Sequence, residues 1–145
     1  MRIHHTRLLV ETQAGANLHD ITPQIRAFLA ESGIREGVAI ISSRHTTTAV
    51  TINENESRLL EDARRFFEKL APVADKYYHN DIELRDCPPD DPRNAHSHLL
   101  AMLLGSSEAI PVIAGELDLG RWQSVMLVEL DGPRSRTVSL QIQGI

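Results

Sequence analysis

Apolar residues recur along the chain with two different periods, and each period predicts a different kind of element. Residues 57–70 carry an apolar stripe at helical spacing, with charged residues on the other side, which predicts an amphipathic helix. An earlier helix is predicted to begin at Thr22, which can cap it, and to close at Gly33. A further helix is predicted over roughly 95–104, and it is expected to end at Gly105.

Runs rich in β-branched residues predict strands between and after these helices. The predicted strands cover 2–12, 38–41, 46–52, 109–113, 122–130 and 135–143. Residues 72–93 contain prolines, acids and isolated aromatics, which predicts a long ordered loop of the kind that is often functional. Because no repeat or linker interrupts the chain, residues 1–145 are expected to form a single α+β domain.

Composition narrows the classes of function. The net charge of -5 and the lack of a basic stripe argue against a nucleic-acid binder, and the pairs Arg64–Arg65 and Arg134–Arg136 are interpreted as solvated surface. No apolar run is long enough to span a bilayer or to serve as a signal peptide. Cys87 is the only cysteine, so no intramolecular disulfide forms, and a reducing, cytoplasmic location is expected.

The first candidate chemistry lies around the second internal strand. His45 stands at a strand junction, where a side chain readily enters a pocket, and it is expected to be catalytic. Asn53, Glu54 and Glu56 follow where this strand gives way to a helix. Glu54 is expected to act as a general base or to orient a histidine, while Asn53 is expected to bind substrate. Glu56 either binds substrate too or interacts with the free backbone donors of the helix.

The second candidate is the pair His96 and His98. A His-x-His pair suits zinc or another metal that favours imidazole. Residues two positions apart on a helix are rotated by about 200° relative to each other, at ~3.6 residues per turn. Both histidine side chains can therefore face one ion only if the segment is a strand, or if it lies ahead of the first full helical turn. In a helix His96 would instead join the apolar side, as a core histidine.

Four further residues are expected to bind substrate. Trp122 suits stacking on a heterocycle and Gln123 suits recognition of its edge, although a core role for the tryptophan is as common. The guanidinium of Arg134 matches a phosphate or carboxylate, unless it is a surface arginine after a turn. His79 is followed two residues later by Asp81, which could orient its imidazole.

Three segments together resemble one known family. The sequences HTTTAVTINENE, NAHSHL and GRWQSVMLVELDGPR are similar to those of the YjbQ-like family, whose members are often labelled secondary thiamine-phosphate synthase enzymes. The resemblance runs from about residue 40 to the end, and the N-terminal strand and helix fit it in order. The segment 79–93 is not matched to a motif of the family, which leaves the roles of His79 and Arg85 open.

The resemblance implies a small α+β protein with a mixed, mostly antiparallel sheet and two to three helices, assembled as a homotrimer with pockets near subunit boundaries. It also implies that His45, His96 and His98 hold a divalent metal ion, or belong to the active site. Because imidazoles favour zinc-like ions over magnesium, a zinc-like ion is expected.

The activity that the resemblance implies is thiamine-phosphate synthesis. This reaction joins a thiazole phosphate to a pyrimidine methyl diphosphate and expels pyrophosphate, so it requires cations that stabilise the leaving charge. Arg44, Arg134 and a bound metal could supply them. Two alternatives stay open: a trimer that binds a metal or metabolite without turnover, and a trimer that only binds a partner.

Overall fold

The computed structural model describes all of residues 1–145 as eight strands, three α-helices and two short 3-10 turns. In chain order these are β1 (Arg2–Glu11), β2 (Gly15–Asp20), α1 (Thr22–Ser32), β3 (Gly37–Ser43), β4 (Thr48–Asn53), α2 (Ser57–Leu70), η1 (Tyr78–Asn80), η2 (Ile82–Leu84), α3 (Ala95–Leu104), β5 (Ser107–Ile113), β6 (Glu116–Leu117), β7 (Ser124–Gly132) and β8 (Ser135–Gly144). The α+β class expected from the sequence is confirmed.

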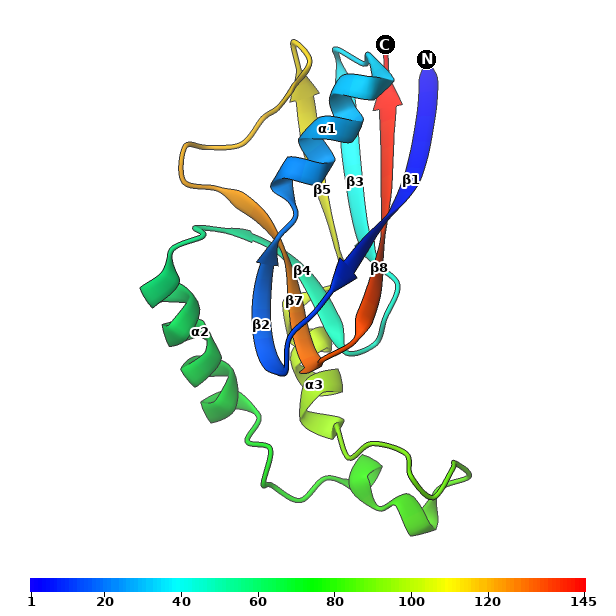
Figure 1. The fold of residues 1–145 in the computed structure, drawn as a ribbon, viewed down its shortest axis with the longest axis vertical. Helices are drawn as coiled ribbons and strands as arrows, with labels where there is room; N and C mark the ends of the chain where they lie inside the picture. Colours follow the sequence, from blue (N-terminus) through cyan, green and yellow to red (C-terminus); the bar gives the residue numbers. More distant parts are fainter.

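The strands form two antiparallel sheets. One sheet has five strands in the order β1-β8-β3-β5-β6, and a smaller sheet has the order β2-β7-β4. Every pairing is antiparallel, so the expected mixed sheet is replaced by two antiparallel ones. The connections β1–β2, β3–β4 and β7–β8 each pass from one sheet to the other, and they meet at one corner of the molecule (Figure 1). This corner positions the polar site described below.

The small sheet is covered on both faces. On one face its residues join α1 and the large sheet in the main core, which includes Ile25, Ile41, Leu127 and Leu140. On the other face a second core forms with α2 and α3. Because both faces of β7 are covered, its side chains from Val125 to Leu130 are all buried.

Three predicted details differ from the structure. Helix α1 is capped at Ile21 without a side-chain bond, because the hydroxyl of Thr22 instead accepts a hydrogen bond from the backbone N–H of Val125 at 2.8 Å. Strand β2 was not predicted, since it contains Gly15 and few apolar residues. Two 3-10 turns shape the predicted loop 72–93.

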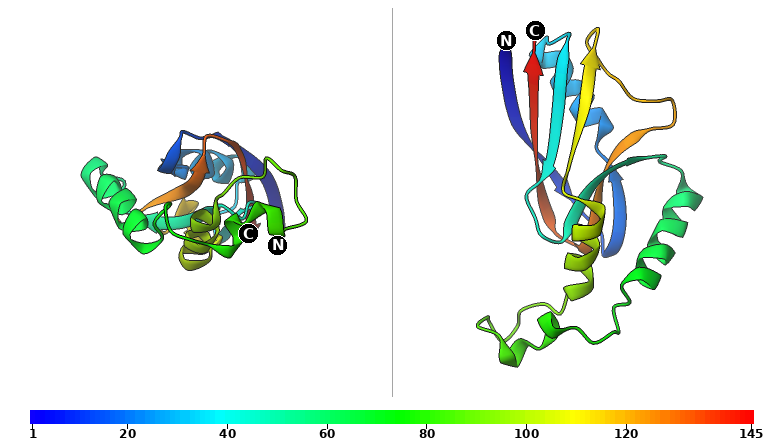
Figure 2. Two further views of the ribbon diagram at one scale, coloured as in Figure 1. Left: turned by 90° about the horizontal axis from the view of Figure 1, so that it is seen from below. Right: turned by 180° about the vertical axis from the view of Figure 1, so that it is seen from behind.

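Helix α2 stands out from the body of the protein (Figures 1 and 2). Of its apolar stripe only Phe67 is buried, while Phe66 is 57% exposed and Leu70 is 46% exposed. The outer side of α3 is also uncovered, with Met102 78% exposed. We call these two surfaces the α2 apolar stripe and the α3 outer face. No helix in the chain has the length and apolar character needed to cross a membrane.

Candidate functional site

A polar cavity of about 540 Å³ opens at the corner where the two sheets meet. Its walls come from the β3–β4 connection, the β7–β8 turn, α3 and the loop before α3. We call it the arginine cavity, because four arginines and three histidines line it beside two aspartates. Its lining residues are Arg44, His45, Thr46, Thr47, His79, Arg85, Asp91, Pro92, Asn94, His98, Asp131, Arg134 and Arg136.

The rear wall is a buried ion pair between Arg136 of β8 and Glu129 of β7. Nε of Arg136 lies 2.8 Å from Oε1 of Glu129, and Nη2 lies 2.6 Å from Oε2. Nη2 also donates to the hydroxyl of Thr47 at 2.9 Å. Arg136 is 4% exposed, so the interpretation of this residue as solvated surface is wrong. The reason is its register, because Arg136 points to the same side of β8 as the buried Val138.

Four donors hold the carboxylate of Glu129. Besides Arg136, the hydroxyl of Thr12 donates at 2.5 Å, and the backbone N–H groups of Leu130 and Asp131 donate at 3.0 and 3.2 Å. Burial alone would raise the pKa of Glu129, but the hydrogen bonds from Arg136, Thr12 and Asp131 together hold this pKa below its usual value. The pair is therefore ionised, and Nη1 of Arg136 has no hydrogen-bond partner within the chain.

Arg134 and Arg85 are held at the sides of the cavity by aspartates. Nη2 of Arg134 lies 2.9 Å from Oδ2 of Asp131, and its Nε donates to the Asp131 carbonyl at the same distance. Arg85 donates to the carbonyl of His79 at 2.7 Å and forms a salt bridge of 3.2 Å with Asp91. Arg44 forms no salt bridge within the chain. The cavity therefore carries more positive than negative charge, as an anion site requires.

His45 is fixed in one tautomer. Its Nε2 accepts a hydrogen bond of 2.9 Å from the backbone N–H of Thr137, so Nδ1 carries the proton of the neutral ring. Burial, followed by the charges of Arg136, Arg44 and Arg134, lowers the pKa of His45 although Glu129 opposes them. His45 is therefore a neutral hydrogen-bond donor, and neither nitrogen has a lone pair free for a metal ion.

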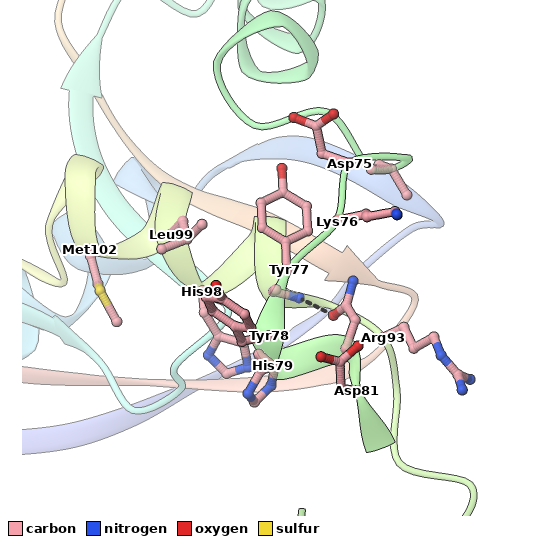
Figure 3. A pocket seen from close by; sticks show the side chains of 13 residues that line it. Asp75, Lys76, Tyr77, Tyr78, His79, Asp81, Arg93, His98, Leu99 and Met102 are labelled. Atoms are coloured by element: carbon pink, nitrogen blue, oxygen red, sulfur yellow. Dashed lines mark hydrogen bonds between the residues drawn. The ribbon is translucent and has the colours of Figure 1, made fainter. Parts of the chain in front are cut away.

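His79 and His98 lie against each other on the opposite wall. Their ring centroids are 4.7 Å apart at 72°, an edge-to-face arrangement (Figure 3). Burial and the neighbouring His79 lower the pKa of His98, whereas Asp131 and a hydrogen bond to the Thr46 backbone oppose this shift. The structure thus brings His79 and His98 into one cavity with His45.

A second, larger cavity of about 1290 Å³ is lined by the same histidine pair (Figure 3). It lies between α3 and the segment that leads through η1, and both histidines belong to its lining as well. We call it the apolar-sided cavity, because Val73, Tyr78, Leu99 and Met102 are among its walls.

His96 lies apart from the other histidines. It lines neither cavity; its Nε2 is 3.2 Å from the hydroxyl of Ser97, and its Nδ1 is buried without a partner. Because 95–104 is a regular helix, His96 and His98 point in different directions, as the rotation of about 200° requires. No group of three or more His, Cys, Asp or Glu side chains in the chain could hold a metal ion. Within one chain, the expected set of His45, His96 and His98 therefore does not converge on one ion.

The predicted residues Asn53, Glu54, Glu56, Trp122 and Gln123 lie at the opposite end of the small sheet. The last pairing of β4 with β7 is Asn53 with Ser124, whereas the arginine cavity adjoins the other end of β7. With nine residues and a rise of ~3.3 Å per residue, β7 separates its two ends by roughly 26 Å. Within one chain these five residues do not reach the histidines.

Local contacts account for three residues of this group. Glu56 caps α2, because its carboxylate accepts from the backbone N–H groups of Arg58 and Leu59 at 2.9 and 2.8 Å, and these bonds lower its pKa. Trp122 is 64% exposed and stacks under the guanidinium of Arg121 at 4.8 Å. Gln123 accepts from the backbone N–H of Gly120 at 2.8 Å. Cap formation was one of the two interpretations of Glu56.

Several residues of the cavity were not identified from the sequence. These are Asp91, Asn94, Asp131 and Arg136 of the lining, and Glu129, which pairs with Arg136 behind it. A signal existed for two of them: Glu129 interrupts an apolar run, and Arg136 is in phase with the apolar alternation of its strand. A charged residue in such a position is buried, and it needs a partner.

The fold and the cavity define a small two-sheet α+β protein with a charged pocket where its sheets join. The sequence matches the family model described as "UPF0047 protein YjbQ-like" over residues 6–145, and the chain belongs to this family. A UPF0047 protein of Methanothermobacter thermautotrophicus is 44% identical over 99% of this chain and 94% of the relative. UPF0047 protein YugU of Bacillus subtilis is 33% identical over 94% of this chain and 97% of the relative.

Solved structures show the same fold. A YbjQ-like protein of unknown function from Sulfolobus solfataricus superimposes with a TM-score of 0.89 at 34% identity, covering 99% of each chain. A hypothetical protein from Aeropyrum pernix superimposes with a TM-score of 0.88 at 36% identity, covering 98% of this chain and 99% of the other. The family and fold expected from the sequence are confirmed.

Proposed function

We propose that the arginine cavity binds the phosphate or diphosphate group of a small metabolite. The observation that carries this proposal is the set of donors without an acceptor inside the chain: Nη1 of Arg136, the Nδ1–H of His45 and the whole guanidinium of Arg44. Guanidinium groups bind phosphate oxygens through paired, charge-assisted hydrogen bonds. The two aspartates pair with Arg85 and Arg134.

The activity that this site supports best is a transfer in which a diphosphate leaves. Thiamine-phosphate synthesis is such a reaction, and we propose it as the activity to be tested first. Fixed positive groups around the leaving oxygens stabilise the charge that develops there. The neutral His45, with its proton on Nδ1, can donate a hydrogen bond to such an oxygen. The alternative is a cytoplasmic protein that binds the same metabolite without turnover.

The residues present do not fit the expected zinc-like ion. His45 has no free lone pair, His96 lines neither cavity, and only His79 and His98 meet. A zinc site needs three or four protein ligands. We therefore expect anion binding to be the same before and after treatment with a chelator. A loss of pyrophosphate binding after chelation, restored by zinc, would contradict this expectation.

The experiment for the binding site is a calorimetric titration with inorganic pyrophosphate. We expect Arg44→Ala and Arg134→Ala each to weaken binding by about tenfold or more, the scale of one charged hydrogen bond. The matched control is Arg121→Ala, which removes an exposed arginine at the other end of β7. Equal affinity in all four proteins would overturn the proposal.

Turnover separates the enzyme from the binding protein. The pure protein is mixed with the thiazole phosphate and the pyrimidine methyl diphosphate, and released pyrophosphate is measured. Release of pyrophosphate that requires both compounds, and that is slower in Arg134→Ala, would support the transferase activity. Tight binding of pyrophosphate without release supports the alternative.

A further inference from the structure

Two cavities of different character share one wall. Apart from Pro92, the residues that line the arginine cavity are polar or charged, whereas six of the thirteen residues around the apolar-sided cavity are hydrophobic. His79 and His98 line both. A molecule that fills the first cavity and extends past this pair of rings therefore enters the second.

We propose that the two cavities form one bipartite site for a phosphate ester whose organic part is apolar. The inference rests on the proposed function, because the phosphate group of the ester is placed in the arginine cavity. It adds that the body attached to the phosphate lies against α3, in the apolar-sided cavity. It favours an apolar body over a polyhydroxylated one such as a sugar.

The wall formed by α3 is the main argument for an apolar body. Ala95, Leu99 and Met102 follow one another at helical spacing, so they present one continuous face to the cavity. Leu99 is 47% exposed and Met102 is 78% exposed in the chain, so their apolar surface is accessible to a ligand. The unbranched, polarisable side chain of a methionine adapts to ligands of different shape and contacts aromatic rings favourably.

The facing wall supports the same class of ligand. Tyr78, labelled in Figure 3, is 94% exposed, and Val73 is a further apolar residue of the lining. The charged residues of the cavity are Asp75, Lys76, Asp81 and Arg93, and all four come from the segments before α3 rather than from the helix itself. A body that contacts α3 therefore meets no charged or hydrogen-bonding side chain of the helix until it reaches His98.

The histidine pair then lies beside the bond that joins the two parts of the ligand. With the phosphate on the arginines and the body on α3, the bridging ester oxygen falls next to His79 and His98. Their edge-to-face packing, with centroids 4.7 Å apart, fixes this border between polar and apolar surroundings. Imidazoles suit such a border, because they are apolar on the ring faces and polar at the nitrogens.

The experiment compares three phosphate probes by calorimetry: inorganic phosphate, glycerol 3-phosphate and phenyl phosphate. We expect phenyl phosphate to bind about tenfold more tightly than the other two, the effect of burying one ring partly against apolar surface. Met102→Ser and Leu99→Ser should remove most of this gain while leaving the affinity for inorganic phosphate unchanged. Tyr78→Ala tests the facing wall, and Leu84→Ser is the matched control, since Leu84 is 82% exposed and lines neither cavity.

The outcomes separate this inference from the proposed function. If none of the probes binds, the phosphate site and the bipartite site both fail. If inorganic phosphate binds and the phenyl group adds nothing, the bipartite site alone is wrong. The bipartite site is also wrong if glycerol 3-phosphate binds as tightly as phenyl phosphate, or if Met102→Ser, Leu99→Ser and Tyr78→Ala, each folded by circular dichroism, all retain the full gain.

Discussion

Arg136 and Glu129 face each other across two strands of different sheets, 2.6 Å apart and with 4% and 0% of their side chains exposed. The pair ties β7 of the small sheet to β8 of the large one at the corner where the chain passes between them. Removing one charge of a buried pair leaves the other without compensation, which is more destabilising than replacing both.

We expect Glu129→Gln to lower the free energy of unfolding by about 3 kcal/mol or more, the usual result of breaking a buried pair. The measurement is urea unfolding followed by circular dichroism. The double variant Glu129→Leu with Arg136→Met removes both charges and should be more stable than Glu129→Gln. If the double variant is the less stable of the two, the attraction within the pair exceeds the cost of burying its charges, contrary to this expectation.

The two glutamates after β4 are expected to differ. Glu56→Gln should lower Tm, because it weakens the cap on the free N–H groups of Arg58 and Leu59. Glu54→Gln should keep both Tm and the affinity for pyrophosphate, since Glu54 does not line the arginine cavity in one chain. A drop of tenfold or more in affinity for Glu54→Gln would support its predicted catalytic role, and would show that another subunit brings it to the cavity.

Assembly as a homotrimer stays a prediction, and the uncovered α2 apolar stripe supports it. Monomers rarely expose a contiguous apolar patch of more than a few hundred Å². We expect light scattering to give the mass of three chains, and Phe66→Asp to reduce it, because Phe66 belongs to the α2 apolar stripe. Arg65→Asp, an exposed neighbour on the polar side of the helix, is the control. A single-chain mass for the wild type at micromolar concentration would contradict the prediction.

Stability is expected to fall as the solution becomes acidic. Burial lowers the pKa of His45 and His98 below the ordinary value of 6.5, so unfolded chains take up these protons at a higher pH than folded ones. Stability is therefore unaffected by them above pH 6.5 and declines as the pH falls from there towards the folded pKa values. We expect a lower urea midpoint at pH 5.5 than at pH 7.5.

Histidine variants test the origin of this decline. His45→Gln should reduce the difference between the two midpoints, whereas His5→Gln, an exposed position on β1, should not. Sulfate, which does not titrate in this range, should raise the midpoint at pH 5.5 by binding the protonated site. An equal difference in the wild type and His45→Gln would show that another group is responsible.

The helices and most strands could be predicted because they follow from local patterns. The stripe of 57–70 and the closing Gly33 depend only on neighbours in the sequence, and both are confirmed, with Gly33 at a φ of 65°. Strand β2 escaped prediction because its pairing with β7, more than a hundred residues away, sets its conformation. The division into two sheets likewise depends on pairings between distant strands.

The candidate site could be predicted only in part. His45, His79, His98 and Arg134 were selected for their chemistry, and the fold brings them to one cavity. Trp122 and Gln123 were grouped with Arg134 because they are close in sequence, yet a strand of nine residues carries them to its other end.

The corner at which three connections pass between the sheets also has a consequence for folding. Its contacts join residues far apart in the chain, such as His45 with Thr137 and Thr12 with Glu129. Contacts of this kind form late, because the loops between them must close first. No fragment of the chain that lacks β8 contains the complete cavity, because Arg136 lines it, so a ligand of the proposed phosphate site would bind only molecules in which both sheets are complete. Such a ligand would raise the free energy of unfolding by mass action, because it has no site on the unfolded chain.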